Sequence, residues 1–432
     1  MTALVLVLMA LGIRQYTLMV IPGDPKKSDR IGRNGLADFQ DVIYYPLQAV
    51  RDGVNPYDCG TDPLPDGSPR YRQRYPVLNL FPLYSPLLFA LYYPFSFGDF
   101  VFSGVVYMAF NVGLLLWLAY VCWRIAGRRP NLGQTTLLTS VMLATLAGRA
   151  NFLGGETAIP LALASLGALR LSPGQPWLAG LALAVTSFKP TFGLPLGILL
   201  LACGHYRTVA IGWSIGLVVG IVGLLLIFSR SGDLARMPEI LLRNQQVLES
   251  DPDVDAQLSA TRVDTAGAIE CWSPLKGRGI QLAASLLVLC VAAGALFQLR
   301  TVHAHPEVEA LTTAIVALST ISSIYHLKYD AVLLWAAIAG VALAPQAYWP
   351  HASRRWRWVV ASLLFTPMIN VLGTHAVSQQ LPYWFPGLTE LPVAWRNFFW
   401  TVVCTLNGLA LLAALGLMAQ HARRLVLTLM SR

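Results

Sequence analysis

Charged residues are scarce in this sequence. Asp, Glu, Lys and Arg make up 12% of the 432 residues, while 55% are apolar. Soluble domains carry about 25% charged residues, so half of the usual charge is missing. The mean hydropathy of +0.56 agrees. The composition excludes an ordinary soluble protein and predicts an all-α, polytopic integral membrane protein.

Several motifs are missing as well. No Lys/Arg block of the kind that binds nucleic acid occurs, so no nucleic-acid partner is expected. The sequence has no GxGxxG unit, no P-loop and no zinc-site spacing, so neither a cofactor nor a metal is expected. Six cysteines are present. Cys59 and Cys271 lie in two polar loops and could form a disulfide if both loops face an oxidising compartment.

Apolar runs recur along the whole chain, and a spanning helix needs about 20 such residues. We expect 3–21 to be an uncleaved first span, because neither a basic segment nor a small-residue cleavage site flanks it. The candidate runs are 3–21, 101–123, 135–149, 156–171, 177–203, 208–228, 278–299, 308–324, 328–344, 357–372 and 396–418.

Two apolar regions are ambiguous. Residues 77–97 contain three prolines and many aromatics, a mixture that favours an interfacial or re-entrant hairpin over a span. Residues 177–203 contain Lys189 and Pro190 in the middle. Because lysine is costly inside a bilayer and proline breaks a helix, we expect two short helices that meet at one membrane face around Lys189.

The arginines favour one topology, with about twelve crossings and both termini in the cytoplasm. The inside loops then hold two acids, Glu307 and Glu309, against twelve basic residues. These are Arg124, Arg128, Arg129, Arg170, Arg207, Arg300, Arg354, Arg355, Arg357, Arg423, Arg424 and Arg432. A rival topology, in which 77–97 crosses and 177–203 crosses once, is less favoured. The chain is thus read as one polytopic domain with long outer loops at 22–76 and 229–277.

Residues 38–58, "DFQDVIYYPLQAVRDGVNPYD", hold four aspartates in the first outer loop. Residues 39–52 can form a helix that lies on the membrane, with Val42, Tyr45, Ala49 and Val50 toward lipid. The segment "GVNPYD" would end this helix, because Gly and Asn-Pro favour turns.

Two interpretations of the first aspartates remain open. Asp38 is placed like an N-cap and Asp41 like a solvated first-turn charge, or one of them is catalytic. In the favoured topology they share the outer face with six other polar residues, namely Arg149, Asn151, Glu156, Lys189, His326 and Lys328. The cations among these could bind an anionic lipid phosphate, or they could be ordinary snorkelling side chains at helix ends.

The hydrophobic first run, the pattern "DF…YY……A…G.NPYD" and the segment "FPLYSPL" resemble glycosyltransferase family 87, of the C-type glycosyltransferase superfamily. The resemblance implies an aspartate general base. Asp38 matches best, and Asp41 is the alternative because the distance to Gly53 is about one residue longer than the family pattern. "NFLGGET" resembles the family's Asn…Gly-Gln turn with Glu156 in place of Gln, and "SFKP" and "SSIYHLKYD" resemble two further motifs.

The resemblance implies transfer of a sugar, with mannose favoured, from a polyprenyl-phosphate donor to a lipid or glycan acceptor. Such a multi-pass enzyme would lie in a bacterial plasma membrane with its active site on the extracytoplasmic face. A single carboxylate acting as base fits inversion, and a phosphate leaving group needs no acid catalyst. A polytopic transporter and a catalytically inactive, lipid-binding relative are the alternative interpretations.

Overall fold

The computed structural model describes residues 36–58, 70–75, 77, 84–249, 261–273, 277–302, 305–370 and 392–431. Within these ranges the chain is helical, and its one β-bridge joins Arg262 to Leu327. The predicted first span at 3–21 lies outside the described residues, and so does Cys59 of the predicted disulfide.

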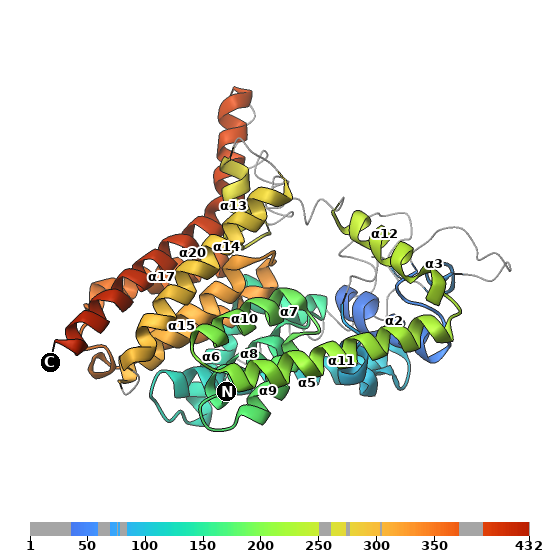
Figure 1. The fold of residues 1–432 in the computed structure, drawn as a ribbon, viewed down its shortest axis with the longest axis horizontal. Helices are drawn as coiled ribbons and strands as arrows, with labels where there is room; N and C mark the ends of the chain where they lie inside the picture. Colours follow the sequence, from blue (N-terminus) through green and yellow to red (C-terminus); the bar gives the residue numbers. More distant parts are fainter. Residues whose placement is uncertain are drawn as a thin grey trace.

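Figure 1 shows the arrangement of the described helices. The first half contains η1 (Phe39–Tyr44), α2 (Tyr45–Arg51), α3 (Tyr71–Arg74), α4 (Leu87–Tyr92), η2 (Tyr93–Ser96), α5 (Phe100–Ile125), α6 (Leu132–Ala144), α7 (Leu146–Gly154), α8 (Ala158–Leu171), α9 (Pro176–Thr186), α10 (Pro190–Ala202) and α11 (Tyr206–Arg230). The second half contains η3 (Leu234–Arg236), α12 (Met237–Glu249), α13 (Thr265–Trp272), α14 (Arg278–Leu299), η4 (Arg300–Val302), α15 (Pro306–Ser323), η5 (Lys328–Leu333), α16 (Leu334–Ile338), η6 (Ala339–Leu343), η7 (Gln346–Tyr348), α17 (Arg354–Ile369) and α20 (Val393–Met430).

Four of the described helices are long and apolar enough to cross a bilayer, namely α5, α11, α14 and α20. The pair α6–α7, which is bent by 82°, would be a fifth span if it counts as one. Large apolar side chains on α5 and α11 are exposed, such as Trp117 and Leu226, as expected of surfaces that face lipid. The expected count of about twelve crossings stays a prediction.

Several of the expected spans are shorter helices. Helices α8, α9 and α10 have 14, 11 and 13 residues, and at 1.5 Å per residue each reaches about half to two thirds of the hydrocarbon thickness. The structure ends α9 at Thr186 and begins α10 at Pro190. The predicted pair of short helices that meet around Lys189 is therefore confirmed. Within 77–97, the described helical part, Leu87–Ser96, is also too short to cross.

The helix predicted at 39–52 exists as η1 followed by α2, but its expected orientation is wrong in part. Val42 and Ala49, expected toward lipid, are buried in the protein core. Phe39 stacks on Tyr107 of α5 with ring centroids 4.6 Å apart. Tyr44 and Tyr45 contact the Phe100 ring of α5. Tyr45 and Val50 are half-buried, so only part of the expected lipid-facing side lies inside the protein.

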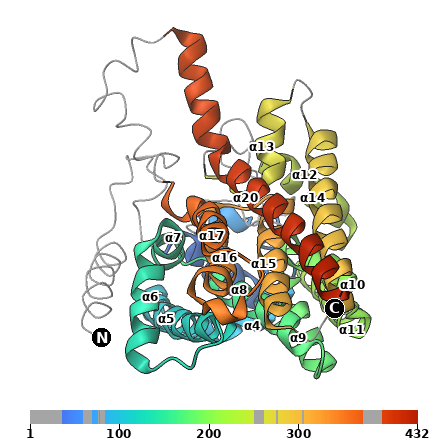
Figure 2. The same ribbon diagram turned by 90° about the vertical axis from the view of Figure 1, so that its left-hand side faces the viewer.

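Helix α15 occupies the middle of the bundle (Figure 2). It packs against α8, α10, α14, α16 and α20, and almost all of its residues from Glu307 to Ser323 are buried. A turn at 324–327 follows and leads into η5. This turn carries the polar residues around which the candidate site is built.

Candidate active site

The centre of the site is a buried ionic cluster of three side chains. The Nζ atom of Lys189 donates to both carboxylate oxygens of Asp330, at 2.7 and 2.8 Å. The imidazole Nδ1 of His326 lies 2.9 Å from Asp330 Oδ2. All three side chains are at most 8% exposed. Such a pair is favourable only because the charges are close and hydrogen-bonded, since burial of either charge alone is costly.

The sequence places Lys189 at a break between helices. Lys189 is the N-cap residue of α10 and precedes Pro190 in the first helical position, where the missing N–H of proline costs nothing. The ammonium also lies 4.8 Å from the centroid of the Tyr329 ring and 5.4 Å from that of Phe192. The aromatic walls and Asp330 thus hold the cation without water.

Each ring nitrogen of His326 faces an oxygen atom that can accept a hydrogen bond. Its Nε2 lies 3.1 Å from the carbonyl oxygen of Thr191, and its Nδ1 faces Asp330. Two acceptors are both satisfied when the ring carries two N–H groups, which is the imidazolium form.

Two more carboxyl groups meet beside this cluster. A Cβ placed on Gly154 would lie 3.1 Å from Asp38 Oδ2 and 3.5 Å from Glu156 Oε1, and the two side chains share a hydrogen bond. Burial, then the neighbouring Asp38, raises the pKa of Glu156 well above its usual range, although Lys189 acts in the opposite direction. Burial, and then Glu156, Asp330 and Asp38, raise the pKa of the Tyr84 phenol. All three carboxyl groups therefore lie near Tyr84.

The double glycine of "NFLGGET" makes this convergence possible. Gly155 ends α7 in the left-handed conformation, with φ of +74°. A Cβ at this position would come within 2.7 Å of the Cβ of Phe39. Any other residue would therefore push the Asp38 segment away from α7. The backbone N–H of Leu36 also donates to the Leu153 carbonyl, at 3.1 Å.

Asn151 ties α7 to the turn that carries His326. Its amide nitrogen donates to the Tyr329 carbonyl at 2.8 Å and to the Ala147 carbonyl at 2.9 Å. Its Oδ1 is buried, and no partner for it lies among the described residues; the same holds for Thr191 Oγ1. Buried polar atoms without partners are rare in native proteins, and they mark places where a ligand or water can bind.

The other predicted residues lie around this centre. Asp41 is buried, and Gln40 Nε2 donates to its Oδ1 at 3.3 Å. After burial and Tyr44, Asp41 contributes to the raised pKa of Tyr45. Arg149 is exposed on α7. Lys328 is half-buried, and its backbone N–H donates to the Thr261 carbonyl at 2.9 Å.

The end of the second polar loop is attached to the site, which sequence reasoning missed. The N–H of Val263 donates to the His326 carbonyl at 3.0 Å. Arg262 binds Asp264 through two hydrogen bonds of 2.9 and 2.8 Å, and its guanidinium lies 5.1 Å from the Tyr325 ring centroid. Asp330 was also missed as a site residue, although its spacing of four from His326 was a usable signal.

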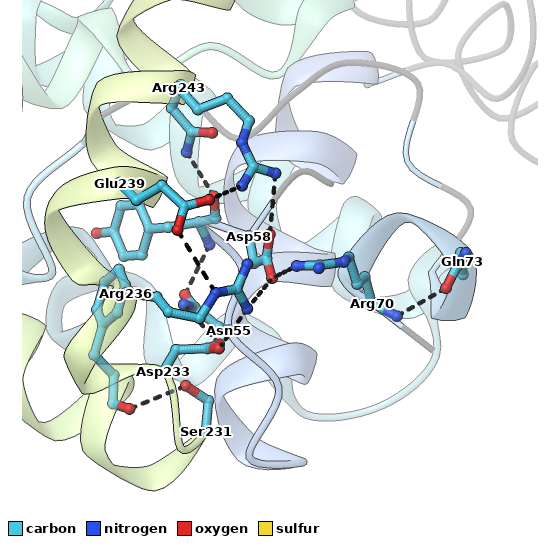
Figure 3. A network of polar contacts seen from close by, with 12 residues as sticks. Asn55, Asp58, Arg70, Gln73, Ser231, Asp233, Arg236, Glu239 and Arg243 are labelled. Atoms are coloured by element: carbon cyan, nitrogen blue, oxygen red, sulfur yellow. Dashed lines mark hydrogen bonds and ion pairs between the residues drawn. The ribbon is translucent and has the colours of Figure 1, made fainter. Parts of the chain in front are cut away.

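A second polar network joins the two long loops to each other (Figure 3). The buried Asp58, of the "NPYD" segment, makes a close ion pair with Arg70. Arg236 and Arg243, from η3 and α12, approach the same carboxylate at 3.7 and 3.8 Å. Asn244 of α12 donates to the carbonyl of Tyr57 at 2.6 Å. These contacts hold the loop that follows α2 against α12.

The described residues form a helical protein with helices long and apolar enough to cross a membrane, and with a buried Lys–Asp–His cluster beside two carboxyl groups. Comparison with protein families identifies the class of protein: residues 82–323 match Glycosyltransferase family 87. Since the match covers more than half of the 432 residues, the chain belongs to this family.

The matched region contains Asn151, Glu156 and Lys189, while Asp38 and His326 lie outside it. A search of curated proteins and a search of solved structures each found no match. The predicted resemblance to the family is confirmed, and with it the assignment as a multi-pass membrane transferase.

Proposed function

We propose that this glycosyltransferase transfers a sugar from a polyprenyl-phosphate donor to an acceptor hydroxyl, with inversion at the anomeric carbon and Asp38 as the general base. The observation that carries the proposal is the convergence of Asp38 with the buried ionic cluster of Lys189, Asp330 and His326. One carboxylate and one phosphate-binding cationic site are what this reaction requires.

In the proposed reaction, a hydroxyl oxygen of the acceptor attacks the anomeric carbon while the bond from that carbon to the phosphate oxygen breaks. The hydroxyl proton passes to the Asp38 carboxylate, and the electron pair of the broken bond stays on the phosphate. Asp38 is half-buried, so an acceptor can approach it from solvent. Asp41 is fully buried beside Gln40, which supports Asp38 over Asp41.

The leaving polyprenyl phosphate gains negative charge as the bond breaks. Lys189 supplies positive charge, and His326 a hydrogen-bonding ring, in a buried place where electrostatic stabilisation is strongest. The unpaired Asn151 Oδ1 and Thr191 Oγ1 are positioned to bind sugar hydroxyls. Lys328 and Arg149, farther out, are proposed as additional contacts to the donor.

The isoprenoid tail of such a donor stays in the bilayer, and only its phosphate and sugar leave the hydrocarbon. We place the reaction on the extracytoplasmic face of a bacterial plasma membrane, with both chain termini in the cytoplasm, because the arginine distribution favours that topology. We also propose mannose as the sugar and a lipid or glycan as the acceptor, as the resemblance to the family implies. Membership of a transferase family supports this activity over transport or lipid binding alone.

Purified protein incubated with a panel of radiolabelled polyprenyl-phosphate sugars tests the proposal directly. We expect consumption of one donor, and a loss of about a hundredfold or more in Asp38→Asn, because the amide cannot accept the proton. Asp41→Asn is the matched variant, three residues along the same helical segment, and should be milder.

Two results would refute the proposal. One is full activity of Asp38→Asn. The other is a wild-type protein that consumes nucleotide sugars but none of the lipid-linked donors.

A further inference from the structure

Glu156 is a buried carboxyl group that the proposed reaction does not use, and its surroundings suggest a defined task. It lies in the turn between α7 and α8 and is 7% exposed. The phenol of Tyr107 donates to its backbone carbonyl at 2.8 Å, which fixes the main chain. Its Oε1 and the Oδ2 of Asp38 both lie against Gly154, 3.5 and 3.1 Å from a Cβ placed there, so the two carboxyl groups are near enough to share a hydrogen bond. Two carboxyl groups can share a hydrogen bond only when one of them holds a proton.

We infer that Glu156 is the protonated member of a carboxyl pair and that its O–H donates to Asp38, so that Asp38 is oriented and remains the anionic base. Glu156 is thus a positioning residue that acts through Asp38, and it does the work that a glutamine N–H would do. This inference rests on the proposed function, since it assigns a role relative to the base of that reaction.

The surroundings decide which carboxyl holds the proton. Glu156 is buried, whereas Asp38 is half-buried. Since burial disfavours the charged form, the proton stays on Glu156. Among the groups that act on Glu156, Asp38 and Asp330 favour its neutral form, and Lys189 favours its anion. The remaining titratable neighbours are the phenols of Tyr84, Tyr107 and Tyr329, which stay neutral at ordinary pH.

The carboxyl pair predicts a specific pH dependence. The pKa of Glu156 is raised, so the proton is present at low pH and is lost as the pH rises through that value. The stability of the folded site therefore declines as the pH rises from the ordinary glutamate value toward that raised value, because only the unfolded state has released the proton there. Above the raised value, two carboxylates face each other with no proton between them, and the orientation of Asp38 is lost. Glutamine at position 156 keeps a donor that does not titrate.

The test compares wild type, Glu156→Gln and Glu156→Ala across pH, with sugar transfer and thermal unfolding as separate readouts. We expect Glu156→Gln to retain most of the transfer rate and to lose the decline at high pH. Glu156→Ala should transfer about tenfold more slowly or worse, since Asp38 loses a charge-assisted hydrogen bond. The unfolding temperature of wild type should fall toward high pH more than that of Glu156→Gln.

The results distinguish the inference from the proposed function. A folded Glu156→Gln protein that is inactive, or one that keeps the wild-type decline in both readouts, would overturn the role of Glu156. If instead Asp38→Asn transfers sugar normally, the proposed base is wrong. The unfolding measurement needs no donor, so it reports on the carboxyl pair even if the donor class is different.

Discussion

Helix α15 has 18 residues and is about 27 Å long at 1.5 Å per residue. Near each of its ends lies a buried carboxylate with two basic partners. At the N-terminal end, Glu307 binds His421 at 2.8 Å and His351 at 3.0 Å. Beyond the C-terminal end, Asp330 binds Lys189 and His326. By residue type alone, the two clusters look alike.

They differ in what surrounds them. Both oxygens of Glu307 have partners, because His351 also donates its backbone N–H to Oε2 at 3.3 Å, and the Trp356 indole packs on His421 with centroids 4.6 Å apart. Near Asp330, two further carboxyl groups approach.

Polar atoms without partners among the described residues also gather at the Asp330 end. They include Asn151 Oδ1, Thr191 Oγ1 and the hydroxyls of Ser319, Ser322 and Ser323. A buried ionic cluster alone therefore indicates structure, and unsatisfied polar groups beside it indicate a site for a ligand.

The largest expected effect is that of Asp330→Asn. It leaves Lys189 and His326 buried with no anion between them, so the free energy of unfolding should fall by about 3–5 kcal/mol. Sugar transfer should be lost as well. Thermal unfolding in detergent and the donor-consumption assay measure the two effects.

The double variant Lys189→Met with Asp330→Leu separates stability from chemistry. Removal of both charges should restore most of the stability, since apolar replacement of a buried ion pair is often neutral or better, while transfer stays lost. Recovery of transfer by this variant would show that the Asp330 cluster, like that of Glu307, is only structural.

An intermediate effect is expected at the other end of the helix. Glu307→Gln removes the charge that binds His351 and His421, and it should lower the free energy of unfolding by about 1–3 kcal/mol. Transfer per folded molecule should not change, because both carboxylate oxygens of Glu307 are already bound by histidines. A selective loss of transfer with normal stability would contradict the distinction between the two clusters.

The smallest effect is expected for Arg149→Ala. Arg149 is exposed on α7, so stability should change by no more than about 0.5 kcal/mol. The rate of transfer measures whether this arginine contributes to phosphate binding beyond Lys189. A loss as large as that of Asp330→Asn would move the main phosphate contact from the buried cluster to Arg149.

Local features of the site could be predicted from the sequence, because each has a local physical cause. Lys189 before Pro190 predicted a break between short helices, because proline lacks the N–H and lysine avoids hydrocarbon, and the structure has that break. The helix after Asp38 was predicted as well. Its burial was not, since period alone does not reveal whether an apolar face meets lipid or protein.

The sequence by itself determined that this chain is a helical membrane protein, where its helices break, and which polar residues lie outside the apolar runs. Those features are local, because they depend on hydropathy and on the backbone chemistry of proline and glycine. Only the tertiary structure decided that Lys189 pairs with Asp330, 141 residues away, and that Asp38 meets Glu156 across the Gly154–Gly155 turn. Such pairs form because helix packing brings distant turns together, and no spacing along a chain encodes which turns will meet.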